Sequence, residues 1–275
     1  MKSIKNKLIK ISGRLFTAIM LGFLYIPIMI LVLFSFNTSK RNIVFQGFTL
    51  EWYHKMLENT RLIEALQNTL IVALVSTAFA VTIGTIGAYG LHKYSFRGKQ
   101  AIQALMYIPV VIPEIILGIA LLSIFSIVNL PLGLLTMIIA HTTFCIPFVV
   151  FTVRARLNGF DNSIEEAAMD LGANRIITFF EIVLPSIMPG VVSGALLSLT
   201  LSMDDVIISF FTTGPDSTTL PMQVFSMVRS GISPDVNAMF TLILAVTVTV
   251  VILTQSDILT HIIGFLRRRT KGARQ

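Results

Sequence analysis

Long apolar stretches separated by short polar segments dominate this chain. Residues 15–39 and 65–91 contain no charged side chain, and each stretch exceeds the roughly 20 apolar residues that a membrane-spanning helix needs. Residues 100–153 contain only one charged residue, Glu114, and the Pro/Gly turn signal at 129–133 divides them into two helices. The pattern predicts six transmembrane helices, at residues 15–36, 65–91, 101–126, 133–153, 189–211 and 236–256.

Composition agrees with this pattern. The chain has 275 residues, of which 54 % are hydrophobic and 13 % are charged, and its mean hydropathy is +0.82. Soluble domains carry about a quarter charged residues, so a soluble enzyme is excluded, and so is a disordered chain. The single cysteine, Cys145, excludes an internal disulfide framework and a cysteine-rich zinc site. We expect an all-α polytopic protein of the cell membrane.

Basic residues predict the orientation of these helices. Sixteen of the 21 lysines and arginines lie in the tail 1–14, the loops 92–100 and 154–185, and the tail 261–275. Cytoplasmic segments carry such an excess, so both termini are expected in the cytoplasm around one membrane domain, 15–260. The net charge of +7 then reports topology and contact with membrane lipid headgroups rather than nucleic acid. The first apolar stretch is long and has no small-x-small cleavage site after it, which favours an uncleaved anchor.

The cytoplasmic loop 154–185 is longer than a simple connection between two helices. Ser163 and Glu166 fit a capping box, with Ser163 as the N-cap of a short helix, and Gly172 fits the stop after it. A second short helix is expected at 174–183, ended by Leu184-Pro185. The sequence therefore predicts two short helices joined by a glycine elbow.

This loop resembles the EAA loop of ABC importer permeases. Glu166-Ala167-Ala168, Gly172 and Ile182-x-Leu184-Pro185 have all the spacings of that motif. Segments such as 94–99, 141–148 and 201–206 also resemble the permease subunits of spermidine/putrescine importers. The resemblance implies a type I importer (MetI-like) fold. It also implies that the loop couples to an ATPase through Glu165, Glu166, Ala167, Ala168, Gly172, Ile182, Leu184 and Pro185.

The same resemblance implies partners. They are an ATPase subunit dimer, a second, PotB-like permease subunit, and an extracytoplasmic polyamine-binding protein. The chain itself contains no phosphate-binding loop, no H-E-x-x-H and no nucleophile elbow. We therefore expect a non-catalytic transport subunit with no catalytic residue, metal site or bound cofactor, and ATP and Mg are used by the partner ATPase.

Three acids lie inside predicted transmembrane helices, where a charge is costly unless it lines a cavity or finds a partner. Asp204 and Asp205 lie in the fifth helix, and Glu114 lies in the third, after two prolines. Asp205 also belongs to a polar stripe at helical spacing, formed by Ser198, Ser202, Asp205 and Ser209. The stripe faces either a translocation pathway or a neighbouring helix to which it hydrogen-bonds.

Aromatic residues complete the predicted pathway. Tyr107 lies seven residues before Glu114, on roughly the same helical face, and an acid beside an aromatic ring suits an ammonium group. Trp52, the only tryptophan, serves either substrate entry or anchoring at the membrane interface. The predicted pathway residues are Glu114, Asp204, Asp205, Ser202, Trp52 and Tyr107.

Carboxylates with hardly any cations along this pathway favour a cationic cargo. We therefore expect the permease subunit of an ATP-driven polyamine (spermidine/putrescine) importer. The same machine with another cargo, such as iron, thiamine or an organic anion, remains an alternative. An ion-coupled secondary transporter and a non-transporting scaffold are further alternatives, but they give no reason for the loop spacing or the polar stripe.

Overall fold

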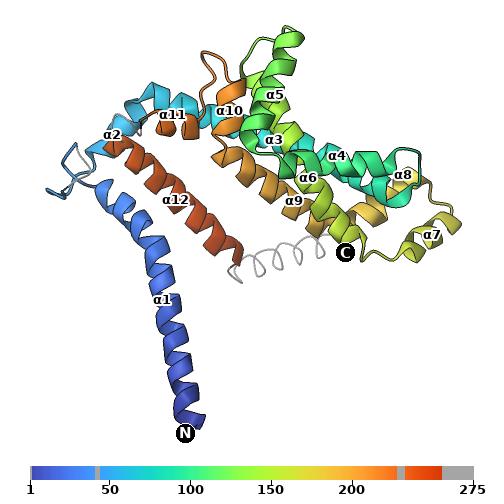
Figure 1. Ribbon diagram of the computed structural model, residues 1–275, viewed down its shortest axis with the longest axis horizontal. Helices are drawn as coiled ribbons and strands as arrows, with labels where there is room; N and C mark the ends of the chain where they lie inside the picture. Colours follow the sequence, from blue (N-terminus) through green and yellow to red (C-terminus); the bar gives the residue numbers. More distant parts are fainter. Residues whose placement is uncertain (1, 41–43, 228–232, 256–275) are drawn as a thin grey trace, which may run out of the picture. The chain divides into compact units, whose positions relative to one another are not determined.

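A computed structural model describes residues 2–40, 44–227 and 233–255, and the predicted tail 261–275 lies outside them. The described residues are mostly helical and contain no β-strand beyond one isolated bridge, between Asn37 and Phe48. Their contacts divide the chain into two units, residues 1–60 with 227–275, and residues 61–226. Figure 1 shows the helices of both units.

The first unit consists of α1 (Lys2–Phe34), α2 (Glu51–Glu58) and α12 (Pro234–Gln255), with α12 packed on the other two. No residue in the most apolar part of α1 is buried. Helices that are apolar and exposed need lipid or another protein around them, as expected for a membrane-spanning helix. Asn59 of this unit donates a hydrogen bond to Asp235, at 2.8 Å, which fixes the end of α2 to the start of α12.

The second unit holds the remaining helices, and α6 and α9 lie side by side at its centre (Figure 1). Their bounds are α3 (Thr60–Lys93), α4 (Lys99–Val111), α5 (Glu114–Ile127), α6 (Leu134–Leu157), α7 (Asn162–Asp170), α8 (Arg175–Thr178), the π-helix η1 (Phe179–Val183), α9 (Leu184–Asp204), α10 (Ile207–Thr212) and α11 (Leu220–Met227).

Small residues allow α6 and α9 to approach closely. Gly190 and Gly194 of α9 have the small-xxx-small spacing of membrane helix contacts. A Cβ atom on Gly194 would lie 2.6 Å from Oγ1 of Thr152 and 3.2 Å from Cα of Val149. A larger residue at position 194 would therefore push the two central helices apart.

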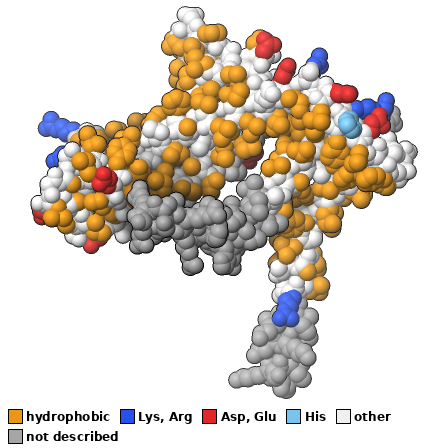
Figure 2. All heavy atoms as spheres, turned by 180° about the vertical axis from the view of Figure 1, so that it is seen from behind, with side chains coloured by type: hydrophobic (Ala, Val, Ile, Leu, Met, Phe, Trp, Pro, Cys, Tyr) orange, Lys and Arg blue, Asp and Glu red, His pale blue; other side chains and the backbone are white. Residues whose placement is uncertain are grey.

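Four described helices are long and apolar enough to cross a membrane, at Ser12–Phe34, Thr60–Lys93, Leu134–Leu157 and Arg175–Asp204. A fifth crossing is reached if α4 and α5 count as one bent span, and α12 contains a shorter apolar helix, Pro234–Thr249. Exposed hydrophobic side chains cover much of the face shown in Figure 2, where charged side chains are few. This surface matches a protein solvated by lipid.

The third predicted helix, 101–126, is not straight. The helical axis bends by 113° between its two parts, α4 and α5. Pro113 lies at the break and has no backbone N–H to donate, so the helical hydrogen bonding stops before it. The expectation that Tyr107 and Glu114 share one helical face assumed a straight helix and is wrong.

The fifth predicted helix, 189–211, has different bounds in the structure at both of its ends. It begins earlier, because Leu184-Pro185 does not end a helix but follows η1 directly and starts α9. A π-helical turn rearranges the backbone hydrogen bonds, so the proline, which lacks an N–H, is accommodated without a stop. The helix then breaks after Asp204, where Asp205 takes an extended backbone conformation before α10 begins.

Candidate functional site

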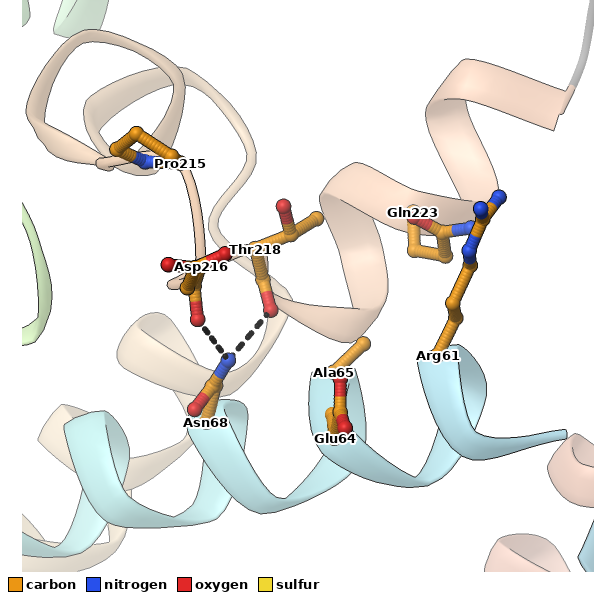
Figure 3. A pocket seen from close by; sticks show the side chains of 8 residues that line it. All are labelled: Arg61, Glu64, Ala65, Asn68, Pro215, Asp216, Thr218 and Gln223. Carbon is orange, nitrogen blue, oxygen red and sulfur yellow. Dashed lines mark hydrogen bonds between the residues drawn. The ribbon is translucent and has the colours of Figure 1, made fainter.

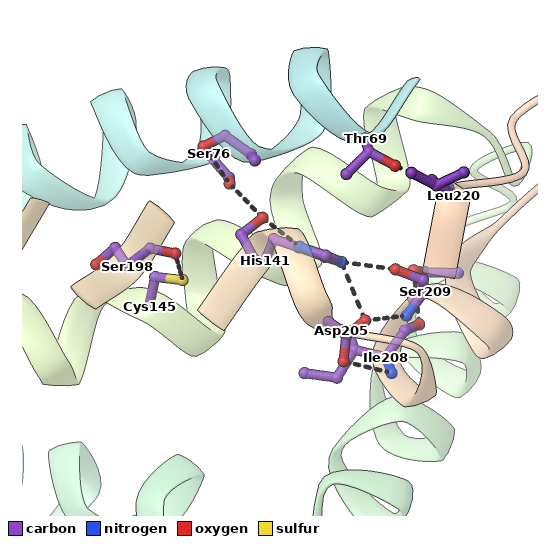
Figure 4. Close-up of polar contacts among 12 residues, drawn as sticks. Thr69, Ser76, His141, Cys145, Ser198, Asp205, Ile208, Ser209 and Leu220 are labelled. Atoms are coloured by element: carbon purple, nitrogen blue, oxygen red, sulfur yellow. Dashed lines mark hydrogen bonds and ion pairs between the residues drawn. The ribbon is translucent and has the colours of Figure 1, made fainter. Parts of the chain in front are cut away.

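A buried histidine lies at the centre of a polar cluster in the second unit (Figure 4). Nδ1 of His141 in α6 lies 2.7 Å from the hydroxyl of Ser202, and Nε2 lies 3.0 Å from the hydroxyl of Ser209. Ser202 also contacts the hydroxyl of Ser76 in α3, at 3.2 Å. The cluster thus joins α3, α6, α9 and α10 through hydrogen bonds that have little competition from water.

Asp205 belongs to this cluster and is buried, with 8 % of its surface exposed. Its carboxylate accepts the backbone N–H groups of Ile208, at 3.2 Å, and Ser209, at 2.7 Å, so it caps α10. The same carboxylate lies 3.4 Å from Nε2 of His141. Its hydrogen-bonding capacity is therefore used within the fold, and the alternative of hydrogen bonding between helices fits Asp205 and Ser202 in this structure.

The other two acids are exposed. Asp204 is the last residue of α9, and Glu114 is the first residue of α5, directly after Pro113. Helix α10, which follows the two aspartates, packs on α5, which begins with Glu114, so the three carboxylates lie in one neighbourhood. The packing of Phe211 in α10 over Gly118 in α5 explains this grouping. The carboxylates of Asp204 and Glu114 make no hydrogen bond to the residues that the structure describes, and two such groups at helix breaks are suited to receive a cation.

The two predicted aromatic residues differ in setting. Tyr107 is exposed on α4, and its ring lies 4.9 Å from that of Phe151. Trp52 is buried in the first unit, where its Nε1 donates to the carbonyl oxygen of Asn37 at 2.6 Å. Trp52 therefore ties α2 to the segment before it, while substrate entry and interfacial anchoring stay predictions for this residue.

The first short helix of loop 154–185 begins two residues earlier than predicted. Asp161, not Ser163, is the N-cap of α7, and its carboxylate accepts the N–H of Ser163 at 2.9 Å. This hydrogen bond lowers the pKa of Asp161. Glu166 consequently lies in the second turn of α7 and is not part of a capping box.

The glycine elbow forms as the sequence predicted. Gly172 has a φ of +93°, a left-handed conformation that favours glycine. The N–H of Gly172 donates to Met169 and that of Ala173 to Ala168, which is the Schellman arrangement at a helix C-terminus. Asn174 then caps α8 by accepting the N–H of Ile177, at 2.8 Å.

The two glutamates of α7 point to different surroundings. Glu166 is exposed, whereas Glu165 is buried against α3 and contacts Tyr89 and Lys93. The predicted coupling residues therefore divide into an exposed group and a buried or half-buried group. Glu166, Ala167 and Pro185 are exposed, while Glu165, Ala168, Ile182 and Leu184 are not.

Large apolar side chains are exposed around the elbow of this polar loop. Leu171 is 90 % exposed and Ile176 is 70 % exposed, with Ile164 on α7 also exposed. Exposed apolar residues grouped beside a helix elbow form a candidate contact surface for another protein. These residues carry no motif spacing, which is why the sequence did not single them out.

A polar cavity of about 310 Å³ lies between the start of α3 and the segment that leads into α11 (Figure 3). Arg61, Glu64 and Asn68 line one side of it, and Asp216 lies opposite. The side-chain amide of Asn68 donates to the carbonyl oxygens of Asp216 and Thr218, at 3.4 and 3.1 Å. The spacing of the three α3 residues, which places them on one helical face, was a signal that sequence reasoning missed.

Comparison with known proteins adds independent information. Residues 80–269 match the family described as binding-protein-dependent transport system inner membrane component. The spermidine/putrescine transport system permease protein PotC of Escherichia coli strain K12 is 44 % identical over 245 residues, which cover 89 % of this chain and 92 % of PotC. The putrescine transport system permease protein PotI of the same strain is 43 % identical over 229 residues, covering 81 % of this chain and 82 % of PotI.

A solved structure has a similar fold. A chain of a bacterial ABC transporter involved in the import of the acidic polysaccharide alginate superposes with a TM-score of 0.75. The match covers 91 % of this chain and 97 % of that chain, at 15 % identity. At that identity the likeness concerns the fold alone.

Proposed function

Since the chain belongs to the family of binding-protein-dependent transport system inner membrane components, we propose that it is a permease subunit of an ATP-driven importer of polyamines. The family places it in the inner membrane as a multi-pass protein. The observation that carries the cargo is the 44 % identity with a spermidine/putrescine permease over 89 % of the chain. The exposed acids at two helix breaks support a cationic cargo independently of that identity.

The proposed topology has six crossings with both termini in the cytoplasm. The bent pair α4–α5 supplies one crossing, and α12 supplies the last. The distribution of lysines and arginines supports this orientation. It places loop 154–185 in the cytoplasm and the cavity near Arg61 on the outer side.

The proposed pathway runs past Glu114 and Asp204. Each carboxylate interrupts or ends a membrane helix, where unpaired backbone carbonyls add further acceptors for an ammonium group. Tyr107, exposed on α4, offers an aromatic face for the methylene chain of a polyamine. In this proposal Asp205, His141 and Ser202 hold the broken helix in place and do not receive the cargo.

The proposed coupling surface is the exposed part of the cytoplasmic loop. Glu166, Ala167 and the apolar side chains of Leu171 and Ile176 would contact the ATPase subunit, with Gly172 setting the angle between the two short helices. ATP and Mg would be bound by that ATPase, and this chain would bind no cofactor. The ATPase dimer, a second, PotB-like permease and a polyamine-binding protein would complete the transporter.

The proposed mechanism is alternating access. A loaded binding protein docks on the outer segments 37–63 and 213–234, and ATP closes the ATPase dimer. The cytoplasmic loops follow, and the two permeases open outward to receive the cargo. Hydrolysis reverses the movement, and the polyamine leaves to the cytoplasm.

Uptake of radiolabelled spermidine tests this function. Cells lacking the chain are compared with cells that express it again, with unlabelled putrescine, thiamine and ferric ion as competitors. Uptake restored by the chain and blocked only by putrescine supports the proposal. If the chain co-purifies with an ATPase but restores no polyamine uptake, the polyamine cargo is refuted and the assignment as an importer permease stands.

A further inference from the structure

Glu165 in the cytoplasmic loop is a buried carboxylate whose two partners both lie at the end of α3. Its Oε1 accepts the hydroxyl of Tyr89 at 2.7 Å and lies 3.1 Å from Nζ of Lys93. Only 2 % of Glu165 is exposed. Tyr89 and Lys93 are four residues apart, so one face of the last turns of α3 holds the carboxylate.

Tyr89 also contacts the second arm of the loop. Its ring lies 4.9 Å from that of Phe179, the first residue of η1. The end of α3 is therefore in contact with the helix before the glycine elbow and with the helix after it. Charge-assisted hydrogen bonds in a buried setting are stronger than exposed ones. The contact of Glu165 with Tyr89 and Lys93 is therefore the strongest of those between the loop and α3.

α3 continues without a break from this contact to the rest of the second unit. It spans Thr60–Lys93, and Ser76 in its middle contacts Ser202 of the His141 cluster at 3.2 Å. Near its start, the hydroxyl of Thr69 accepts the backbone N–H of Leu220 at 2.8 Å. The one helix α3 therefore contacts Glu165 at its end, the polar cluster in its middle, and the segment that follows the cavity near its start.

We propose that Glu165 is a positioning residue that fastens α7 to α3, so that a movement imposed on the cytoplasmic loop is carried into the membrane by α3. The inference rests on the proposed function, because it takes the loop to be the part that the ATPase moves. It assigns Glu165 a role different from that of Glu166. Glu166 faces outward toward a partner, and Glu165 connects the loop to its own chain.

The first test replaces Glu165 by Gln, which keeps the volume and one acceptor for Tyr89 but removes the charge facing Lys93. We expect the initial rate of spermidine uptake to fall about two- to thirtyfold, while co-purification with the ATPase stays within twofold of the unchanged protein. Tyr89→Phe keeps the ring contact with Phe179 and should give a smaller loss. Asp170→Asn, an exposed acid on the same helix, is the matched control and should leave uptake unchanged.

The second test measures the connection itself and does not depend on the cargo. Spin labels are placed at Ile86→Cys on α3 and Asp170→Cys on α7, both exposed, after the buried Cys145 is replaced by Ala. The distance is measured in the assembled complex, without nucleotide and after trapping with ADP and vanadate. For the protein with Glu165 in place, we expect the same narrow distance distribution in both states. With Glu165→Gln, we expect a distribution that is broadened or that differs between the two states.

The two tests separate the inference from the proposed function. An unchanged narrow distance with Glu165→Gln, or unchanged uptake, overturns the role of Glu165. Loss of ATPase co-purification in Glu165→Gln also overturns it, because the residue would then act in assembly. If the unchanged protein shows the expected spin-label distances but imports no polyamine, only the proposed cargo is refuted.

Discussion

Oδ2 of Asp205 lies 3.4 Å from Nε2 of His141, at the point where the helix that carries Asp205 breaks. The acid and the imidazole hold α10 against α6, and the carboxylate also supplies the cap of α10. Because both groups are buried, this pair stabilises the fold rather than an open binding surface.

Replacement of Asp205 by Ala should therefore lower stability. We expect a loss on the order of 1–3 kcal/mol in the free energy of unfolding, because two amide groups of α10 lose their acceptor and His141 loses one contact while keeping Ser202 and Ser209. The protein is heated in detergent, and the loss of its monodisperse size-exclusion peak with rising temperature reports the change in stability. Asp204→Ala is the matched control next to it and should leave the unfolding temperature unchanged. Equal shifts for the two variants would contradict the structural role of Asp205.

Replacement of Glu114 by Gln, or of Asp204 by Asn, should affect transport and not stability. Each change removes one charge that would pair with an ammonium group, so the apparent KM for spermidine should rise about tenfold or more. Initial uptake rates over a range of spermidine concentrations measure it, and Asp170→Asn is the control. An unchanged KM in both variants would remove these acids from the pathway.

Gly172→Ala should uncouple the transporter. The left-handed backbone at Gly172 costs a side-chain-bearing residue about 1–2 kcal/mol, which favours a different elbow between α7 and α8. Uptake should fall, and Gly172→Ala combined with Glu166→Ala should abolish it while membrane insertion persists. Gly98→Ala is a matched control, because Gly98 has a φ of +90° and equally open surroundings in another loop. Transport that survives in the double variant would refute the coupling role.

Gly194→Ala should weaken the contact between α6 and α9. The new Cβ atom would lie 2.6 Å from Thr152 Oγ1 and close to the backbone of Val149, and such overpacking costs about 1–3 kcal/mol. The unfolding temperature in detergent should fall. Gly87→Ala in α3, where a Cβ atom meets nothing within 4 Å, should leave it unchanged or raise it. An unchanged or higher unfolding temperature with Gly194→Ala would contradict the close contact of α6 and α9 at this position.

Sequence patterns predicted the features that depend on local composition. The apolar stretches, the helical loop and the glycine elbow at Gly172 follow from residues close together in the chain. The break at Asp205 has no such signal, because neither proline nor glycine lies there. It depends on amide groups of the next helix and on His141, which is 64 positions away in the numbering of the chain.

The burial of Glu165 shows the same limit. Two adjacent glutamates look equivalent in sequence, and only the position of Tyr89, separated from Glu165 by 76 residues, distinguishes them. The N-cap was misplaced for a local reason. Aspartate and serine both cap helices, and Asp161 and Ser163 compete for nearly the same amide groups.

The π-turn at Phe179–Val183 has a mechanical consequence. Because it lets the chain pass Pro185 without a loop, one continuous helical rod runs from Arg175 to Asp204, about 45 Å at 1.5 Å per residue. A rotation of the Arg175 end of this rod passes toward Asp204 along continuous helix, which contains Pro189 as well as the π-turn. The wider π-turn is a place along this rod where helical winding can be gained or lost, so it affects how much of a rotation arrives at the other end.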